Sequence, residues 1–244
     1  MTSSKSIQFT VLSLFPDYFR GPLDESMMKR AQEKGLVQIE LVNIREYAED
    51  KHKKVDDRPY GGGPGMVMMP EPVCAAIRAH RKKDDKKASR VIYLSPQGPT
   101  LTAQKCRELA QVEHLILLCG HYEGVDERVI ESEVDEEISI GDFVLTNGCL
   151  AACVLIDAVV RFVPGVIGDE RAASEDSFEQ GLLDWPHYTR PEVFEGVRVP
   201  EVLTSGNHKE ILAFRKKAAK EKTKAKRPDL WAAYDLQNDR SNNQ

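Results

Sequence analysis

Three glycine-rich turns are the residues of this sequence best suited to chemistry. They are Ser-Pro-Gln-Gly at 95–98, Gly-His-Tyr-Glu-Gly at 120–124, and an apolar segment at 138–148 that glycines interrupt. Glycine lets backbone amides approach a ligand that a side chain would exclude. Because open α/β sheets bind ligands at the carboxyl ends of their strands, we expect the three segments to line one pocket.

The elements that position these turns alternate along the chain. Alternating or continuous apolar runs predict strands, and apolar residues at helical spacing predict helices. Strands are predicted at 7–11, 37–43, 91–94 and 115–119, and helices at 16–35, 71–81, 102–112 and 148–161. This order predicts an α/β fold class with a largely parallel sheet.

Residues 56–66 hold two prolines and four glycines, which break helices and weaken strands. We therefore expect no regular structure here. The prolines would stiffen the segment, which favours a shaped, substrate-facing loop over mere flexibility.

Charge is unevenly distributed in a chain whose formal net charge is −5. Residues 207–227 contain nine basic and two acidic side chains, whereas residues 123–142 contain nine acidic and one basic. The net charge excludes a broadly basic nucleic-acid coat, but the basic segment could face a polyanion. The alternative is an ordinary solvated helix face.

Five cysteines without a Cys-x-x-Cys pair argue against a disulfide framework or a structural zinc site. Cys149 and Cys153 are interpreted as small buried residues of a helix, and no metal site is predicted. The apolar tract 149–160 contains Asp157 and is shorter than the ~20 residues of a bilayer-spanning helix. The first residues lack the apolar core of a signal peptide, so we expect a cytoplasmic protein without a membrane partner.

Taken together, these segments closely resemble the bacterial tRNA (guanine-N1)-methyltransferases, the TrmD family of SPOUT methyltransferases. The resemblance covers nearly the whole chain and rests on seven motifs, at 56–66, 95–98, 120–128, 139–145, 175–178, 186–191 and 205–208. Each motif alone is weak evidence, but seven in the family's order are highly specific.

The resemblance implies a SPOUT-type, largely parallel sheet with a C-terminal trefoil knot in residues 1–167. A flexible linker at 168–175 and a small, mainly helical tRNA-binding domain at 176–244 would follow, in an obligate homodimer. Such enzymes transfer a methyl group from S-adenosylmethionine to N1 of guanosine 37, just 3′ of the anticodon, in tRNA that also carries guanosine 36. True knots are almost absent from proteins, so the residues alone would not predict one.

By its match to the family, the sequence also implies the site residues. The cofactor cradle would comprise Tyr93, Leu94, Ser95, Gly98, Gly120, Tyr122, Glu123, Ile140, Gly141, Asp142, Phe143, Val144, Leu145 and Gly148. Glu123 would hold either the methionine end of the cofactor or a magnesium ion (Mg2+). The tRNA would contact Arg190, His208, Lys209 and Arg215, the last three on a helix that Asn207 and Glu210 begin.

The resemblance makes Asp176 the general base that accepts the guanine N1 proton, and Arg161 the cation that stabilises charge on guanine O6. Read alone, Asp176 is typical of a helix N-cap, and Arg161 of a cation at a helix C-terminus.

The sequence departs from the family pattern at several positions. Many members carry Gly-Gly-Glu-Leu-Pro where residues 147–151 are Asn-Gly-Cys-Leu-Ala, and an arginine where this chain has His121. These changes favour an alternative, a noncatalytic RNA-binding protein, while Arg161 and Asp176 count against it. A ribose 2′-O-methyltransferase on the same scaffold is a second alternative, and a small-molecule nucleotide enzyme a third that would not need the basic segment.

Overall fold

The computed structural model describes residues 6–82, 88–168 and 175–242, with side chains described up to residue 236. By internal contacts the chain divides into two compact units, Met1–Gly168 and Asp169–Gln244. Most of the predicted linker, residues 169–174, lies outside the described residues.

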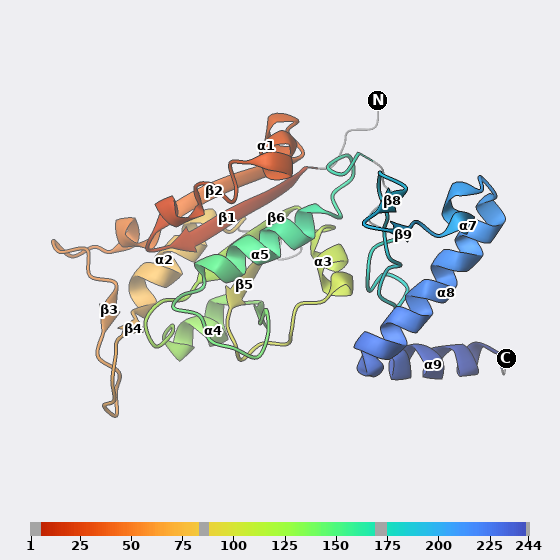
Figure 1. Cartoon of the computed structure of the whole chain (residues 1–244). Coiled ribbons are helices and arrows are strands. Elements are labelled where there is room, and N and C mark those ends of the chain that lie inside the picture. The colour runs from red at the N-terminus through yellow and green to blue at the C-terminus, as the bar shows by residue number, and fades with distance from the viewer. Residues whose placement is uncertain (1–5, 83–87, 169–174, 243–244) are drawn as a thin grey trace. The chain divides into compact units, whose positions relative to one another are not determined.

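The first unit is built on a parallel five-stranded sheet in the order β2-β1-β6-β5-β7 (Figure 1). Its strands are β1 (Ile7–Ser13), β2 (Val37–Asn43), β5 (Ser89–Leu94), β6 (His114–Cys119) and β7 (Glu136–Ile138). Every pairing within this sheet is parallel. The structure therefore confirms the α/β class, the largely parallel sheet and the four predicted strands.

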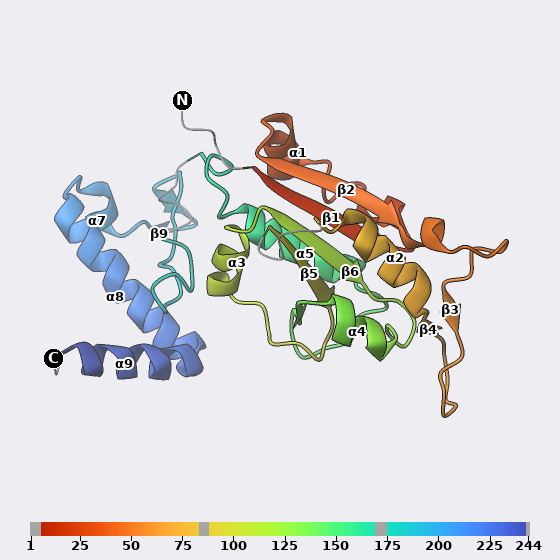
Figure 2. The ribbon, with the colours of Figure 1, turned by 180° about the vertical axis from the view of Figure 1, so that it is seen from behind.

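Helices cover both faces of the sheet, because alternate residues of the central strands are apolar on both sides. On β6, Leu115, Leu117 and Cys119 belong to one hydrophobic core, while Ile116 and Leu118 belong to the other. The first core includes α1 (Ser26–Glu33), α3 (Ala103–Leu109) and α5 (Cys149–Val160), and the second includes α2 (Pro70–His80) and α4 (Glu127–Glu133). The view from behind shows α2 and α4 in front of the sheet (Figure 2).

Two local predictions were wrong or incomplete. The predicted helix 16–35 is instead a 3-10 turn, η1 (Pro16–Phe19), followed by α1, because Gly21 with φ +92° breaks the helical path. The loop 56–66 is not wholly irregular: β3 (Asp56–Asp57) pairs with β4 (Val67–Met68), so the loop is the tip of a β-hairpin. Another 3-10 turn, η2 (Ile44–Tyr47), follows β2.

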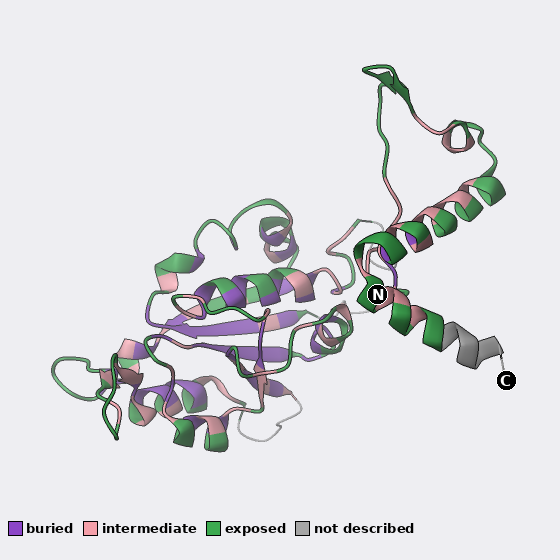
Figure 3. Ribbon diagram, turned by 60° about the horizontal axis from the view of Figure 1, so that its bottom comes forward, coloured by how far each residue is buried: buried purple, intermediate pink, exposed green. Residues whose placement is uncertain are grey.

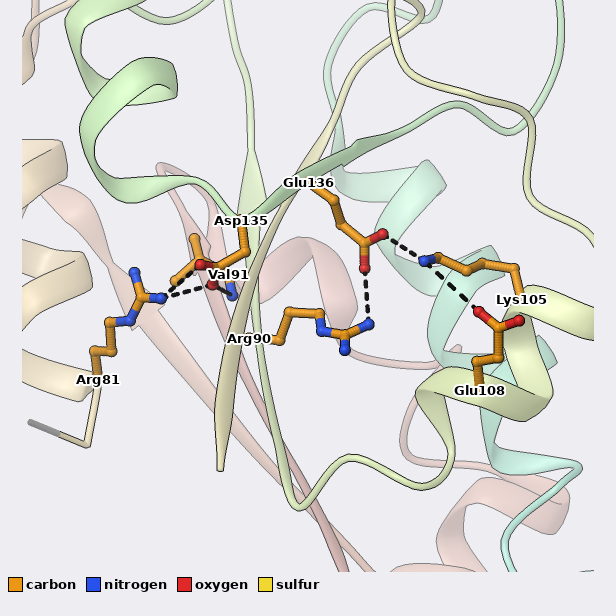
Figure 4. A network of polar contacts seen from close by, with 7 residues as sticks. All are labelled: Arg81, Arg90, Val91, Lys105, Glu108, Asp135 and Glu136. Carbon is orange, nitrogen blue, oxygen red and sulfur yellow. Dashed lines mark hydrogen bonds and ion pairs between the residues drawn. The ribbon is translucent and has the colours of Figure 1, made fainter. Parts of the chain in front are cut away.

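The acidic segment 123–142 folds into α4 and β7, which were not predicted. Three of its carboxylates, those of Glu133, Asp135 and Glu136, form ion pairs with basic side chains from elsewhere in the unit. Asp135 accepts two hydrogen bonds from Arg81 at 2.7 Å, while Glu136 contacts Arg90 and Lys105 (Figure 4). These carboxylates hold the edge strand β7 to its neighbours rather than forming a separate acidic surface.

The second unit contains a two-stranded hairpin, β8 (Val193–Phe194) with β9 (Val197–Arg198), and the helices α7 (Glu201–Thr204), α8 (His208–Lys226) and α9 (Pro228–Asn242). Asn207 caps α8 by accepting a hydrogen bond from the Glu210 backbone, as predicted. The buried Thr223 accepts the Leu183 N–H at 2.9 Å and so ties the chain before the hairpin to α8. Burial is sparse elsewhere: most residues of β8, β9 and α8 are exposed (Figure 3).

Among the described residues, no helix is both long and apolar enough to cross a membrane.

Candidate functional site

The three glycine-rich segments line one cavity at the carboxyl ends of β5, β6 and β7, with a volume of about 140 Å³. Twelve of the fourteen predicted cradle residues line it: Tyr93, Leu94, Ser95, Gly120, Tyr122, Glu123, Ile140, Gly141, Phe143, Val144, Leu145 and Gly148. Gly98 and Asp142 do not. Their roles in binding stay predictions, but the chain brings the segments together as parallel strands require.

The glycines of this site permit close approach of the surrounding chain. A Cβ on Gly120 would lie 2.8 Å from the Tyr93 hydroxyl, and one on Gly148 would lie 3.0 Å from both Cys119 Cα and Gly120 N. Gly98 has a structural role, since its Cβ would overlap the backbone that joins Glu137 to Ile138. Glycine at these positions therefore sets how tightly the segments pack around the cavity.

One edge of the cavity is joined to the hairpin β3–β4. Met66 accepts the Glu123 N–H at 2.9 Å, and Gly65 packs against the Glu123 carboxylate so closely that a Cβ would overlap it. Tyr122, the residue before Glu123, has φ +59°. This left-handed conformation is uncommon for a bulky residue and is typical of functional sites. The glycine-rich hairpin tip thus begins at the edge of the cavity.

The sequence interpretation missed a polar cluster beneath the cavity. Cys149, the first residue of α5, is fully buried, with its Sγ 3.3 Å from Ser13 Oγ and 3.8 Å from His121 Nε2. The hydrogen bond from the Cys119 thiol lowers the pKa of Cys149 to about 5, against the effect of burial. His121 lines the cavity, and its position within the Gly-His-Tyr-Glu motif was the only signal in the sequence that could have pointed to it.

The other missed lining residues adjoin predicted ones along the chain. They are Pro96, Gly124, Ile138, Ser139, Thr146, Asn147 and Ala151. All of them except Ala151 lie within the three glycine-rich segments that were predicted to line one pocket, although they were not named as cofactor-binding residues.

The two predicted catalytic residues lie in different units. Arg161 is the C-cap residue that follows α5, half-buried and with helical φ and ψ. Asp176 lies in a bend, and its carbonyl accepts the Glu179 N–H at 3.3 Å in the turn that follows. Asp176 is thus not the N-cap of any helix in the described part of the chain.

The second unit holds a cavity of about 540 Å³, and two of the four predicted tRNA-contacting residues, Arg190 and Arg215, line it. The Arg215 guanidinium lies 4.8 Å from the centre of the Trp185 ring, a cation–π contact. His208 and Lys209 do not line the cavity and are exposed at the start of α8. No cluster of three metal-binding side chains occurs among the residues that the structure describes.

Comparison with known proteins identifies the family to which this chain belongs. A family model described as "tRNA (Guanine-1)-methyltransferase TrmD" matches residues 7–233. A protein of Protochlamydia amoebophila named "tRNA (guanine-N(1)-)-methyltransferase" is 66% identical over 91% of this chain and 98% of its own length. Relatives of the same name from Chlamydia pneumoniae and Chlamydia muridarum are 57% and 55% identical over 93% of the chain. The chain spans 62% and 63% of their lengths. Since the match extends across both units, the chain belongs to the tRNA (guanine-1)-methyltransferase TrmD family.

Proposed function

We propose that this protein transfers a methyl group from S-adenosylmethionine to N1 of guanosine 37 in tRNA that carries guanosine at position 36. The observation that carries the proposal is the convergence of three glycine-rich segments on one cavity, in a chain of the TrmD family. The relatives' names support the substrate and the reaction class. The family's trefoil knot belongs to the same proposal.

The residues around the cavity fit S-adenosylmethionine. Apolar side chains of Leu94, Ile138 and Ile140 suit an adenine ring, and the carboxylate of Glu123 suits the amino group of the methionine end or a magnesium ion. When bound, the cofactor supplies an electrophilic methyl group. The chain's own residues would hold it in place and keep water from the reacting atoms.

The enclosed cavity of a single chain is smaller than an ordinary ligand pocket. Its volume of about 140 Å³ falls below the roughly 300–1,000 Å³ of ordinary ligand pockets. Phe143 and Val144 on its rim are 54% and 83% exposed, which is unusual for apolar side chains beside a pocket. Both observations support a homodimer in which a second copy of the chain covers the cofactor.

Two residues would carry the chemistry. Asp176 accepts the N1 proton of guanine, and Arg161 stabilises the negative charge that develops on O6. Removing the base should slow methyl transfer about 10²- to 10⁴-fold. Single-turnover rates of Asp176→Asn with saturating cofactor test this, with Glu175→Gln as a matched control that neutralises the neighbouring exposed carboxylate. A loss below about tenfold in Asp176→Asn would exclude the general-base role.

The shared site has its own test. Mixed dimers of Arg161→Ala and Asp176→Asn chains should regain one working site if each site takes one residue from each chain. Subunit exchange must be verified by differently tagged chains. Full exchange without recovered activity would contradict the shared site.

The basic side of α8 would contact tRNA phosphates. Lys209 and Lys216 are exposed, whereas Lys220 lies 5.5 Å from the Tyr234 ring centre and Arg215 contacts Trp185. Lys209→Ala with Lys216→Ala should therefore weaken tRNA binding and lower its salt dependence by about one to two phosphate contacts. The pair Lys29→Ala and Lys34→Ala removes the same charge from α1 and the residue after it, and should change neither quantity.

The decisive experiment supplies methyl-labelled cofactor and unmodified tRNA, then digests the RNA and identifies the labelled nucleoside. We expect 1-methylguanosine, and only in transcripts with guanosine at 36 and 37. A 2′-O-methylated nucleoside would indicate ribose chemistry. Binding of tRNA without any labelled product would indicate a noncatalytic RNA-binding protein.

A further inference from the structure

Two glycine-rich segments that line the cavity are joined at one point. Gly148, which precedes α5, donates its N–H to the Gly120 carbonyl after β6 at 2.8 Å. The two chain segments are 28 residues apart in sequence and have no room for a Cβ between them. Any change in their separation would change the width of the cavity.

Beneath this junction, a histidine and a cysteine connect the same two segments through their side chains. His121 Nδ1 lies 3.0 Å from the Cys119 carbonyl, which can only accept, so Nδ1 carries a proton. Nε2 is then the nitrogen that faces Cys149 Sγ, at 3.8 Å. His121 is 5% exposed and Cys149 is fully buried, so water does not compete for this contact.

The surroundings of Cys149 favour a thiolate. Its sulfur lies at the N-terminus of a twelve-residue helix, where the helix dipole favours negative charge. The Cys119 thiol, Ser13 and His121 contribute to the lowered pKa of Cys149, while burial raises the pKa of Cys119 well above its ordinary value and keeps that group a donor. Cys153 is the other titratable neighbour, and burial raises the pKa of its thiol to about 11.

We infer that Cys149 and His121 form a buried thiolate–imidazolium pair that positions the two glycine-rich segments of the cofactor pocket, and so sets cofactor affinity. The inference rests on the proposed function, since it takes S-adenosylmethionine as the ligand. Both residues stand where the sequence departs from the family pattern. Cys149 does not line the cavity, so it acts through His121 and through the backbone of Gly120 and Gly148, and is a positioning residue.

The first test measures the pair without any ligand. The ultraviolet absorbance of thiolate should be present in the full-length protein at neutral pH, fall to half near pH 5 and disappear at lower pH. Cys149→Ser should abolish this signal. Cys153→Ser, which replaces a buried thiol one turn along the same helix, should retain it. An unchanged signal in Cys149→Ser would overturn the pair.

The second test measures cofactor binding by titration calorimetry. Cys149→Ala and His121→Gln should each weaken S-adenosylmethionine binding about tenfold, as expected for a lost hydrogen bond to a charged group. The double variant should lose no more than either single one, because both remove the same interaction. Cys153→Ala should bind like the unmodified protein. Additive losses, or affinities within about twofold of the control, would contradict the inference.

Two further readouts separate positioning from general damage. With saturating cofactor, kcat of Cys149→Ala should stay within about threefold while the KM for S-adenosylmethionine rises, because only ground-state binding is lost. Melting curves identify any variant that does not fold, and the isosteric Cys149→Ser then replaces it. If the unmodified protein shows the thiolate but does not bind S-adenosylmethionine, the proposed function fails, and the absorbance of the variants alone decides the pair.

Discussion

A buried histidine stands at the start of strand β6, and another lies just beyond its end. His114 is 2% exposed and His121 is 5% exposed, and both ring nitrogens of each have polar partners. The partners differ. His114 contacts two hydroxyl groups within the sheet, whereas His121 contacts a backbone carbonyl and a thiol beside the cavity.

These partners give the two rings different hydrogen-bonding roles. Thr10 donates its only hydroxyl proton to Glu40 at 3.1 Å, so His114 Nε2 must donate to Thr10, and Nδ1 accepts from Ser89 at 2.9 Å. His121 instead donates from Nδ1 to the Cys119 carbonyl, and in the inferred pair its Nε2 donates to the Cys149 sulfur. Burial lowers the pKa of His114 to about 4, which keeps it neutral. The same residue type, equally buried, is thus a neutral link in the sheet at one end of β6 and the base of a reactive pair at the other.

The largest expected effect is on the stability of the protein, and it comes from His114, at the end of β6 away from the cavity. His114→Ala would leave a cavity and two buried hydroxyl groups with lost partners, and should lower the free energy of unfolding by about 3–5 kcal/mol. Denaturant unfolding measures this. The folded fraction should bind cofactor normally, in contrast to His121→Gln, since His114 lies at the opposite end of β6 from the cavity. Weakened cofactor binding in folded His114→Ala would remove the distinction between the two ends.

The second effect is a dependence of stability on pH. The pKa of His114 is about 4 in the folded state and near 6.5 when unfolded, so between these values the unfolded chain binds more protons. Its contribution to stability is present above pH 6.5 and is lost as pH falls toward 4, by roughly 3 kcal/mol in total.

His114→Gln keeps polar contacts but cannot titrate. The difference between the unfolding free energies of the unmodified protein and this variant should therefore shrink or invert as pH falls through that window. A constant difference from pH 7 to pH 4 would mean that His114 titrates normally in the folded protein.

The sequence predicted much of the fold because its signals are local. The continuous apolar run at 115–119, the alternation at 37–43 and the helical spacing at 71–81 each formed the expected element. The central strand β6 is buried on both faces and so needs continuous apolar residues, whereas the edge strand β2 exposes Gln38 and Glu40. Strand β7 was missed because no apolar run marks it: two of its three residues are Glu136, which is partly buried by ion pairs at a sheet edge, and Glu137.

The candidate site was predictable only in part for a related reason. Glycines at strand ends indicate where a ligand could bind, so twelve predicted residues lie around one cavity. No local pattern indicates that Cys149 meets His121, or that Ser13 reaches the same sulfur from β1. Such contacts depend on strand order, which the sequence does not state. For the same reason, the sequence alone does not show that His114 and His121, at opposite ends of β6, have different partners.

The third effect concerns the junction of Gly120 and Gly148 beside the cavity. Gly148→Ala would force its Cβ to within 3.0 Å of backbone atoms that cannot rotate away, and should cost about 1–3 kcal/mol of stability. It should also weaken cofactor binding by spreading the two glycine-rich segments. Gly168→Ala is the matched control, because a Cβ there meets nothing within 4 Å. Equal behaviour of the two alanine variants would show that the junction tolerates separation.

The smallest expected effect is on the charge of the Cys149 sulfur, which we expect to depend on Ser13 beside His121 but not on Thr10 beside His114. Ser13 accepts the Phe15 N–H at 3.1 Å, so its own proton is free to be donated to Cys149 Sγ at 3.3 Å. Ser13→Ala should cost only about 1 kcal/mol of stability, a typical net value for one hydrogen bond. It should nevertheless raise the pH at which the Cys149 thiolate forms, because a donor to the charged sulfur is lost.

Thr10→Val is the counterpart on the same strand, since it removes the hydroxyl that contacts His114. It should leave the thiolate absorbance unchanged, because Thr10 contributes nothing to the surroundings of Cys149. Its cost should be about 1–3 kcal/mol, since the Nε2–H of His114 then has no acceptor in a buried position. Suppose that Ser13→Ala left the pH of Cys149 thiolate formation unchanged while Thr10→Val shifted it. The charge on Cys149 would then depend on the sheet as a whole and not on its own neighbours. The contrast between a structural and a reactive histidine would then have to be abandoned.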